Sequence, residues 1–436
     1  MKKRYLALGA VMVLLGICTV LVGYLLAQGY LWFSSRGRST ESPQSHPRQL
    51  EIQIFEGGYG KAFWRKTIAE FQKEYPDIQL TVNIGYDVNE EMKIRWIAGN
   101  GPDIVFTDGP TFPKMAFQQE GKFLDVSSWL DEVETDPGVM LGDVILPQTV
   151  RYFSDGKLYI LPYMLSSWEL WYDAASLQPP ANSSEAQQLM DTLTQAGVPL
   201  LAYPGQYPLY LSRGILYPAL VQQGGEPIAQ RLLQADASIT DDPAFRQVLR
   251  QLKELADNDL LARYEEEYDH IGVQKEWAAH KIAFVPGGLW LPNEMKNYLP
   301  AEFSPACVNG LIGEDAQEEV QAISTIGWAV SATTRNEDEA KAFIGFLYRG
   351  QVLRELMESL HNPVACRVDM QGLQVQPAVE QQQQRVQSGQ TEVVMLDFID
   401  PRFESTLTEQ LERFLFAEGT LEEIHRELLQ TVQSTP

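Results

Sequence analysis

The chain has 436 residues, of which 44% are hydrophobic and 10% aromatic, and its formal net charge is -24. That length and composition can fill two hydrophobic cores. The negative charge, with no basic block in the part expected to fold, would repel a nucleic-acid backbone and so argues against a nucleic-acid partner.

The chain begins with three basic residues and a long apolar segment that carries no charge until Arg36. This segment exceeds the about 20 apolar residues that a helix needs to cross a bilayer. It also exceeds the apolar core of a secretory signal, about 7–15 residues. A lipid-modified Cys18 is a third alternative, but the bulky Ile17 fits poorly before it. We expect residues 1–35 to be an uncleaved anchor, and the basic start then places the remaining chain outside the cytoplasm.

Residues 36–49 contain almost no apolar side chain and are expected to be a flexible linker of about 20–25 Å. From Leu50 onward, strand and helix patterns alternate. Apolar alternation or short apolar runs predict strands, and spacings near 3.6 predict helices. The predicted order is strand 50–55, helix 63–71, strand 78–84, helix 89–98 and a strand from Ile104. This order indicates an open parallel sheet with helices on both faces.

Two of these strands end in acidic, aromatic and glycine residues. The first continues as FEGGYG, residues 55–60, and the third as TDGP, residues 107–110. Ligands of open α/β sheets bind outside the carboxyl ends of the strands. Glu56, Tyr59 and Asp108 are therefore candidate ligand contacts, although an Asp-Gly pair also forms ordinary turns.

Aromatic residues and glycines gather in two later segments. In LPYMLSSWELWYD, residues 161–173, Ser166 and Trp168 are candidates for a ligand surface, and Trp171 and Tyr172 for the core. Trp290 follows Pro-Gly-Gly, which lets an indole project from a loop, although a single tryptophan is usually buried. Aromatic faces pack against sugar C–H groups, and carboxylates bind sugar hydroxyls, so this chemistry suits a saccharide.

The C-terminal half shows clear helix starts. Asp241 or Asp242 would cap a helix that begins near Pro243, and Asn336 would cap another. Thr420 and Glu423 form a capping box before the last helix. The glutamine-rich segment 374–390 is compatible with a mobile loop or a polar helix.

Motifs for metal, cofactor or nucleophilic chemistry are not recognisable in the sequence. The five histidines show no metal-ligand spacing, and the acidic segment 264–270 is interpreted as a solvated helix. A phosphate-binding loop, a dinucleotide fingerprint and a nucleophile elbow are missing, so we expect no cofactor and no metal. A glycosidase needs only two carboxylates and is not excluded by spacing. Cys307 and Cys366 could form one disulfide or remain two free thiols.

Several motifs taken in chain order carry a family resemblance. They are FEGGYG, GPDIVFTDG, GKLYILPYMLSSWELWYD, KIAFVPGGLW and ISTIGWAVSATTRNEDEAKAFIGFL. Together they resemble the extracellular solute-binding proteins of carbohydrate ABC importers, the family that includes maltose-binding protein. The resemblance runs from Leu50 nearly to the C-terminus. PGGLWLPNEM also resembles the branch that binds N-acetylglucosamine or its oligomers.

The resemblance implies an α/β fold of the two-lobed periplasmic-binding-protein type II, each lobe an open sheet flanked by helices. Lobe 1 would comprise residues 50–162 and 328–366, and lobe 2 residues 163–327 and 367–436. It also implies ligand contacts on both lobes and at the crossovers. These are Glu56, Tyr59 and Asp108 on lobe 1, Ser166, Ser167, Trp168, Tyr207 and Trp290 on lobe 2, Trp328 beside the returning crossover, and Arg402 as a late contact.

The function that the resemblance implies is a monomeric, non-enzymatic receptor that captures a mono- or oligosaccharide between its lobes. It would present the sugar to ABC transporter permease subunits and be held at the membrane by its N-terminal segment. The family's usual lipid-attachment motif is poorly matched here. An extracellular glycoside hydrolase and a sugar-sensing receptor subunit remain the alternatives.

Overall fold

The structure, a computed structural model, describes residues 48–109, 112–308, 320–389 and 392–434. The predicted anchor over residues 1–35 lies outside the described residues, as does nearly all of the predicted linker. Within the described ranges, no helix combines the length and apolarity needed to span a bilayer. The fold described below is that of the unit Gln49–Pro436.

Within the described residues, one mixed sheet contains eight strands. Six follow the order β2-β1-β3-β9-β4-β7, while β10 pairs with β9 and β8 with β4. The strands are β1 (Gln49–Phe55), β2 (Gln79–Gly85), β3 (Ile104–Phe106), β4 (Leu161–Asp173), β7 (Val285–Gly288), β8 (Pro305–Val308), β9 (Val320–Val330) and β10 (Glu392–Met395).

The first three strands have the predicted parallel arrangement. β1 pairs in parallel with both β2 and β3, and helices α2 (Ala62–Glu74) and α3 (Val88–Ile97) connect them. Ile52 and Ile54 are fully buried, as their alternation with polar residues predicts. The next strand, β9, is antiparallel to β3, so the sheet is mixed beyond the segment whose pattern indicated parallel pairing.

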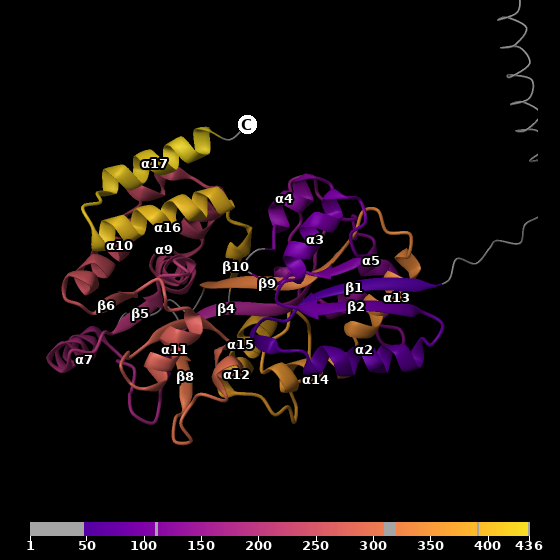
Figure 1. Cartoon of the computed structure of the whole chain (residues 1–436), viewed down its shortest axis with the longest axis horizontal. Helices are drawn as coiled ribbons and strands as arrows, with labels where there is room; N and C mark the ends of the chain where they lie inside the picture. Colours follow the sequence, from indigo (N-terminus) through magenta and orange to yellow (C-terminus); the bar gives the residue numbers. More distant parts are fainter. Residues whose placement is uncertain (1–47, 110–111, 309–319, 390–391, 435–436) are drawn as a thin grey trace, which may run out of the picture. The chain divides into compact units, whose positions relative to one another are not determined.

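Strands β4 and β9 lie side by side in the middle of the sheet (Figure 1). The first half of β4 pairs with β9, with Pro162 opposite Gly327, and the second half pairs with β7 and β8. A β-carbon at Gly327 would lie 2.1 Å from the carbonyl oxygen of Leu161, so this close pairing requires glycine. These two strands connect the N-terminal strands with the later ones.

The first hydrophobic core draws its buried residues from 50–164 and 326–379. Phe63 and Phe71 lie on the buried face of α2, as their spacing predicts. The helices of this part of the chain, besides α2 and α3, are η1 (Gly57–Tyr59), α4 (Lys114–Gln119), α5 (Trp129–Glu132), α6 (Leu141–Val144), η2 (Pro147–Thr149), α13 (Glu337–Leu347) and α14 (Gly350–Leu360).

A second hydrophobic core draws its buried residues from 170–284 and 396–428. A two-stranded parallel sheet of β5 (Leu201–Pro204) and β6 (Leu261–Tyr264) belongs to it. The remaining helices are α7 (Ser183–Ala196), α8 (Leu209–Leu211), η3 (Ser212–Leu216), α9 (Tyr217–Leu233), η4 (Ala237–Asp241), α10 (Pro243–Asp257), α11 (His270–Ala278), α12 (Leu291–Met295), α15 (Pro377–Ser388), η5 (Leu396–Phe398), α16 (Pro401–Phe416) and α17 (Leu421–Gln433).

The predicted helix caps are found at two of three positions. The Asp242 side chain accepts a backbone N–H in the first turn of α10, and Thr420 and Glu423 form the capping box of α17. Asn336 lies at the N-cap position of α13 but does not cap it with its side chain. Its amide instead donates to both carboxylate oxygens of Asp103, at 3.1 Å each. That competing contact explains the failed prediction.

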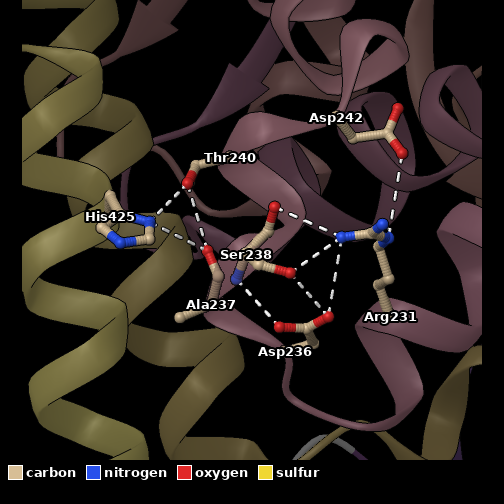
Figure 2. Close-up of polar contacts among 7 residues, drawn as sticks. All are labelled: Arg231, Asp236, Ala237, Ser238, Thr240, Asp242 and His425. Carbon is tan, nitrogen blue, oxygen red and sulfur yellow. Dashed lines mark hydrogen bonds and ion pairs between the residues drawn. The ribbon is translucent and has the colours of Figure 1, made fainter.

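Polar contacts fasten the last helix to the second core (Figure 2). On α17, His425 Nδ1 lies 2.7 Å from the hydroxyl oxygen of Thr240 on η4. On α9, Arg231 forms ion pairs with Asp236 at 3.6 Å and with Asp242 at 3.8 Å. The segment between α9 and α10 is thus stabilised by ion pairs with α9 and by a hydrogen bond with α17.

Three further sequence questions are settled by the structure. The glutamine-rich segment contains helix α15, in which the buried Gln383 donates to the Cys366 carbonyl oxygen at 2.9 Å. Cys307 and Cys366 are both free thiols. The acidic segment 264–270 runs from the end of β6 to the start of α11, and its exposed glutamates lie at a turn between them, not in a helix.

Candidate functional site

The first wall of the candidate site forms where β1 and β3 end, and consists of Glu56, Tyr59 and Asp108. Because these strands are parallel neighbours, their carboxyl ends reach the same edge of the sheet. Gly57 has a φ of 51° and Gly109 a φ of 104°. Side chains with a β-carbon rarely adopt such angles, so both glycines are needed to form the two turns.

Asp108 is the most perturbed carboxyl group of this wall. Its Oδ1 accepts a hydrogen bond from the Gly109 backbone N–H at 2.7 Å. Burial raises the pKa of Asp108 to about 6, although this N–H and the nearby Lys114 act in the opposite direction. Glu56 is paired with Lys61 at 2.9 Å. Asp108 therefore supplies an acceptor that is not neutralised by a direct ion pair among the described residues.

Tyr59 lies deeper than the two carboxylates. Its side chain is 6% exposed, and its hydroxyl donates to Asn362 Oδ1 at 3.1 Å. Burial raises the pKa of Tyr59 well above its ordinary value, and the negative charges of Asp108 and Glu294 add to this effect. Tyr59 is thus a neutral phenol close to two carboxyl groups.

The second wall is formed by three rings that come later in the chain than the first wall: Trp168 on β4, Tyr210 on α8 and Trp290 after β7. The ring centroids of Trp168 and Trp290 are 5.4 Å apart at 85°, and those of Trp168 and Tyr210 are 4.8 Å apart at 86°. These are edge-to-face contacts, which aromatic pairs favour. A β-carbon at Gly288 would lie 1.7 Å from Trp290 Cζ3. Only glycine can therefore occupy this position while the indole lies where it does.

The two walls touch through Gly58 of η1. A β-carbon at this residue would lie 3.0 Å from Trp290 Cδ1 and 3.3 Å from Glu294 Oε1. The Asn293 side chain donates to the Gly58 carbonyl oxygen at 2.6 Å. The strand end of the first core and helix α12 are therefore in direct contact, and the small size of Gly58 permits it.

Glu294 belongs to the second wall beside Trp290, and two polar side chains bind its carboxylate. His270 Nε2 lies 3.3 Å from Glu294 Oε1, and the Gln274 amide donates to Glu294 Oε2 at 3.0 Å. Hydrogen bonding to Glu294 and its negative charge raise the pKa of His270, against the lowering effect of burial. The His270 ring also stacks on Tyr210, with 6.1 Å between centroids.

A separate cavity has a volume of about 650 Å³, which is typical of ligand pockets, and none of the wall residues named above lines it. Its lining includes Phe112 and Lys114 after β3, Pro208 and Arg213 near α8, and Glu404 on α16. The Arg213 guanidinium binds the Glu404 carboxylate through two hydrogen bonds of 2.7 and 2.5 Å. Arg213 also lines a smaller pocket together with Trp168, which links the cavity to the second wall.

Other candidates from the sequence lie around this group. Ser166 and Ser167 are buried within β4, 5% and 3% exposed. Tyr207 is 39% exposed, and its ring meets the His270 ring at 5.7 Å between centroids. Arg402 lies in the first turn of α16 and pairs with Asp400 at 3.4 Å, one residue from the cavity-lining Pro401.

The structure does not bring Trp328 to the two walls. Its side chain is fully buried in the first core, where it meets Trp64 edge to face at 5.6 Å. The resemblance placed Trp328 beside a crossover strand, and it does lie on β9. Its side chain, however, points into the layer packed against Trp64 and Phe343.

The sequence did not single out Tyr210, Glu294, Lys114 or Arg213. Glu294 stands four residues after Trp290, and that helical spacing is the one signal that could have found it. The acidic pattern around His270 indicated a solvated segment instead of a supporting contact. Together, the rings and acceptors of the two walls suit a ligand with apolar faces and hydrogen-bond donors.

Comparisons with known proteins agree with this arrangement. A family model described as bacterial extracellular solute-binding protein matches residues 57–350, more than half of the chain. A comparison with curated protein sequences returns no match.

Solved structures with the same fold cover most of the chain at low identity. A chitin oligosaccharide binding protein is 16% identical, with a TM-score of 0.70, 88% of this chain covered and 98% of that one. Apo RafE from Streptococcus pneumoniae is 20% identical, with a TM-score of 0.61 and coverages of 88% and 97%. The GacH receptor of Streptomyces glaucescens, solved unliganded and with acarbose, is 16% identical, with a TM-score of 0.64 and coverages of 90% and 100%. These likenesses establish the two-lobed α/β fold.

Proposed function

The chain belongs to the family of bacterial extracellular solute-binding proteins, and from this premise we propose that it captures a saccharide for an ABC importer. The observation that carries the proposal is the contact of two walls, one with carboxylates at the ends of β1 and β3 and the other with aromatic rings. Rings can pack on sugar C–H faces while Asp108 accepts from hydroxyl groups. The similar structures of a chitin oligosaccharide binding protein and of a receptor in complex with acarbose support the same ligand class.

The ligand contacts that we propose are those that lie on the walls or border the cavity. They are Glu56, Tyr59 and Asp108 on the first wall, Trp168, Tyr210 and Trp290 on the second, and Lys114 and Arg213 at the cavity. Tyr207 and Arg402 would contact only a longer ligand, because both lie outside the walls. Ser166 and Ser167 would act through the shape of β4, because they are buried.

We propose lobes of residues 50–162 with 328–366 and of 163–327 with 367–436. The division is supported by the two hydrophobic cores and by the long strands β4 and β9 that connect them, although residues 368–379 pack in the first core. Ligand binding would shift an open–closed equilibrium, because closure gives the ligand contacts that neither wall offers alone. The Asn293–Gly58 hydrogen bond would be one of the contacts formed on closure.

The family is one of binding proteins, and its members are extracellular. We propose that this chain works as a monomer, is held at the membrane by residues 1–35, and delivers its ligand to permease subunits. A long apolar N-terminal segment supports the tether. Catalysis is not part of this proposal.

Calorimetry and thermal shift with a saccharide panel test the proposal. The panel contains chitotriose, raffinose, xylotriose, galactose and acarbose, and each mixture is analysed for products after incubation. We expect at least one saccharide to bind, to raise the melting temperature and to remain intact. Binding of none of them would contradict the proposed ligand class, and sustained release of hydrolysis products would contradict a pure receptor.

A further inference from the structure

Glu294 is a carboxylate of the second wall that lies against the backbone of the first. It stands four residues after Trp290, the N-cap residue of α12, and this spacing places the two side chains on the same side of the helix. Its Oε1 would lie 3.3 Å from a β-carbon at Gly58, and Trp290 Cδ1 would lie 3.0 Å from the same position. The acid and the indole therefore reach the first wall together.

Among the described residues, the Glu294 carboxylate is held in place without a lysine or an arginine. Gln274, which is 1% exposed, donates to one of its oxygens, and the His270 ring lies at the other. Among the described residues, its only ion-pair partner is His270, and no lysine or arginine pairs with it. Its side chain is 13% exposed. A mostly buried carboxylate needs hydrogen-bond donors, and it can accept about four hydrogen bonds. Two are supplied by the protein, so acceptor capacity remains at the wall.

Glu294 and Asp108 approach the same part of the site from opposite walls. Both carboxyl groups raise the pKa of the Tyr59 phenol, in addition to the effect of its burial. A β-carbon at Gly57 would lie 3.4 Å from Asp108 Oδ2, and a β-carbon at Gly58 would lie 3.3 Å from Glu294 Oε1. The α-carbons of adjacent residues are about 3.8 Å apart along the chain, so the two acids flank one short stretch of backbone.

We propose that Glu294 determines ligand specificity at this end of the site by accepting a hydrogen bond from a ligand hydroxyl group opposite Asp108. Gln274 and His270 are positioning residues that orient the carboxylate. The inference rests on the proposed function and adds a contact to it. Because both acids only accept while ionised, this end of the site takes a group that donates and repels a ligand carboxylate.

Glu294→Gln tests the role of the carboxylate, since glutamine keeps its shape and removes its charge. Glu276→Gln is the matched control, because Glu276 lies on α11 and pairs with Lys281 outside the two walls. Affinity for each panel saccharide that the unaltered protein binds is measured by calorimetry on the full chain. We expect Glu294→Gln to weaken binding about tenfold to hundredfold and the control to leave it unchanged.

Two His270 variants separate positioning from general structure. His270→Ala removes the ring nitrogen next to Glu294, whereas His270→Gln can return a donor at a similar place. We expect the first to weaken binding severalfold and the second to restore most of the affinity. Equal losses in both variants would contradict the positioning role.

The outcomes separate this inference from the proposed function. If the unaltered protein binds a panel saccharide and Glu294→Gln binds it equally well, Glu294 is not a specificity residue, while the proposed function stands. If the unaltered protein binds none of the five saccharides, both proposals fail. Melting curves of every variant identify any loss of affinity that comes from unfolding. If Glu294→Gln melts early, Glu294→Asp replaces it, because aspartate keeps the charge but shortens the side chain by one methylene group. A Glu294→Asp protein that melts normally must then bind the saccharide more weakly.

Discussion

Two pairs of tryptophans meet edge to face in this protein with almost the same geometry. Trp64 and Trp328 have ring centroids 5.6 Å apart at 86°, and Trp168 and Trp290 have theirs 5.4 Å apart at 85°. The first pair is almost completely buried in the first core, whereas both rings of the second pair are only partly buried. Ring geometry alone therefore does not distinguish a core from a binding surface.

The surroundings of the two pairs make the difference. Trp328 is covered by α2 and α13, whose Phe343 meets it at 5.8 Å. Trp290 instead lies between Gly288 and Gly58, neither of which has a side chain to cover it. β3 joins both environments, because Phe106 packs against Trp328 while Asp108, two residues later, reaches the first wall. Backbone glycines thus leave one indole partly exposed, whereas side chains bury the other.

Trp328→Ala should have the largest effect and acts on the buried pair. Removing a fully buried indole should lower the free energy of unfolding by about 3–5 kcal/mol. Denaturant unfolding would measure this loss, with Trp290→Ala as the comparison. If Trp328→Ala unfolded like the unaltered protein but bound ligand poorly, Trp328 would belong to the binding site and not to the core.

Trp290→Ala should act mainly on binding. Loss of a ring that a sugar covers removes about 1.5–3 kcal/mol of apolar contact, or roughly tenfold to a hundredfold in affinity. Calorimetry with a bound panel saccharide would measure it. Normal affinity with a much lower melting temperature would show that Trp290 belongs to the core, as Trp328 does.

The sequence predicted local features of both regions well. Alternation placed Ile52 and Ile54 in a buried strand, and the strand ends placed Tyr59 and Asp108 at one edge of the sheet. These predictions succeed because strand periodicity and turn glycines are encoded within a few residues. The motif order also indicated the two-lobed fold, which the solved structures share.

Contacts between distant segments could not be predicted in the same way. His270 and Glu294 lie 24 residues apart, and their contact depends on how α11 packs beside α12. Tyr210 lies in a helix of three residues, which is too short to show the hydrophobic periodicity that predicts a helix. Trp328 directly follows Gly327 and Trp290 stands two residues after Gly288, so a nearby glycine marks both, and only the helices packed on Trp328 determine that it is buried.

Asp108→Asn should have a smaller, pH-dependent effect at the junction of the two regions. The pKa of Asp108 is about 6 in the folded protein, against about 3.9 for an unfolded aspartate. The folded state therefore holds more protons between these values, and the free energy of unfolding falls as the pH rises from about 4 to about 6. For one proton, this slope is at most about 1.4 kcal/mol per pH unit.

Denaturant unfolding from pH 4 to pH 8 would compare Asp108→Asn with the unaltered protein. Glu169, whose pKa burial raises to about 7, has the same sign and remains in both proteins. We expect the variant to lose only the part of the slope below about pH 6. Ligand affinity of the unaltered protein should increase over the same range, because an ionised Asp108 is the better acceptor. If the free energy of unfolding had the same pH dependence in both proteins, the Asp108 carboxyl group would be exposed to solvent and not buried.

Gly58→Ala should have the smallest effect and tests why Trp290 remains uncovered. The added methyl group would lie 3.0 Å from Trp290 Cδ1, so the indole must shift by a few tenths of an ångström. A side chain forced off its preferred rotamer costs about 0.5–1.5 kcal/mol, which predicts a loss of affinity of about two- to tenfold. Gly60→Ala is the matched control in the same turn, since a β-carbon there meets nothing within 4 Å but its φ of 71° strains the backbone. The control should therefore lower stability and leave affinity intact, whereas Gly58→Ala should lower affinity and leave stability nearly unchanged. If both variants changed only stability, the glycines of this turn would serve folding, and the exposure of Trp290 would need another cause.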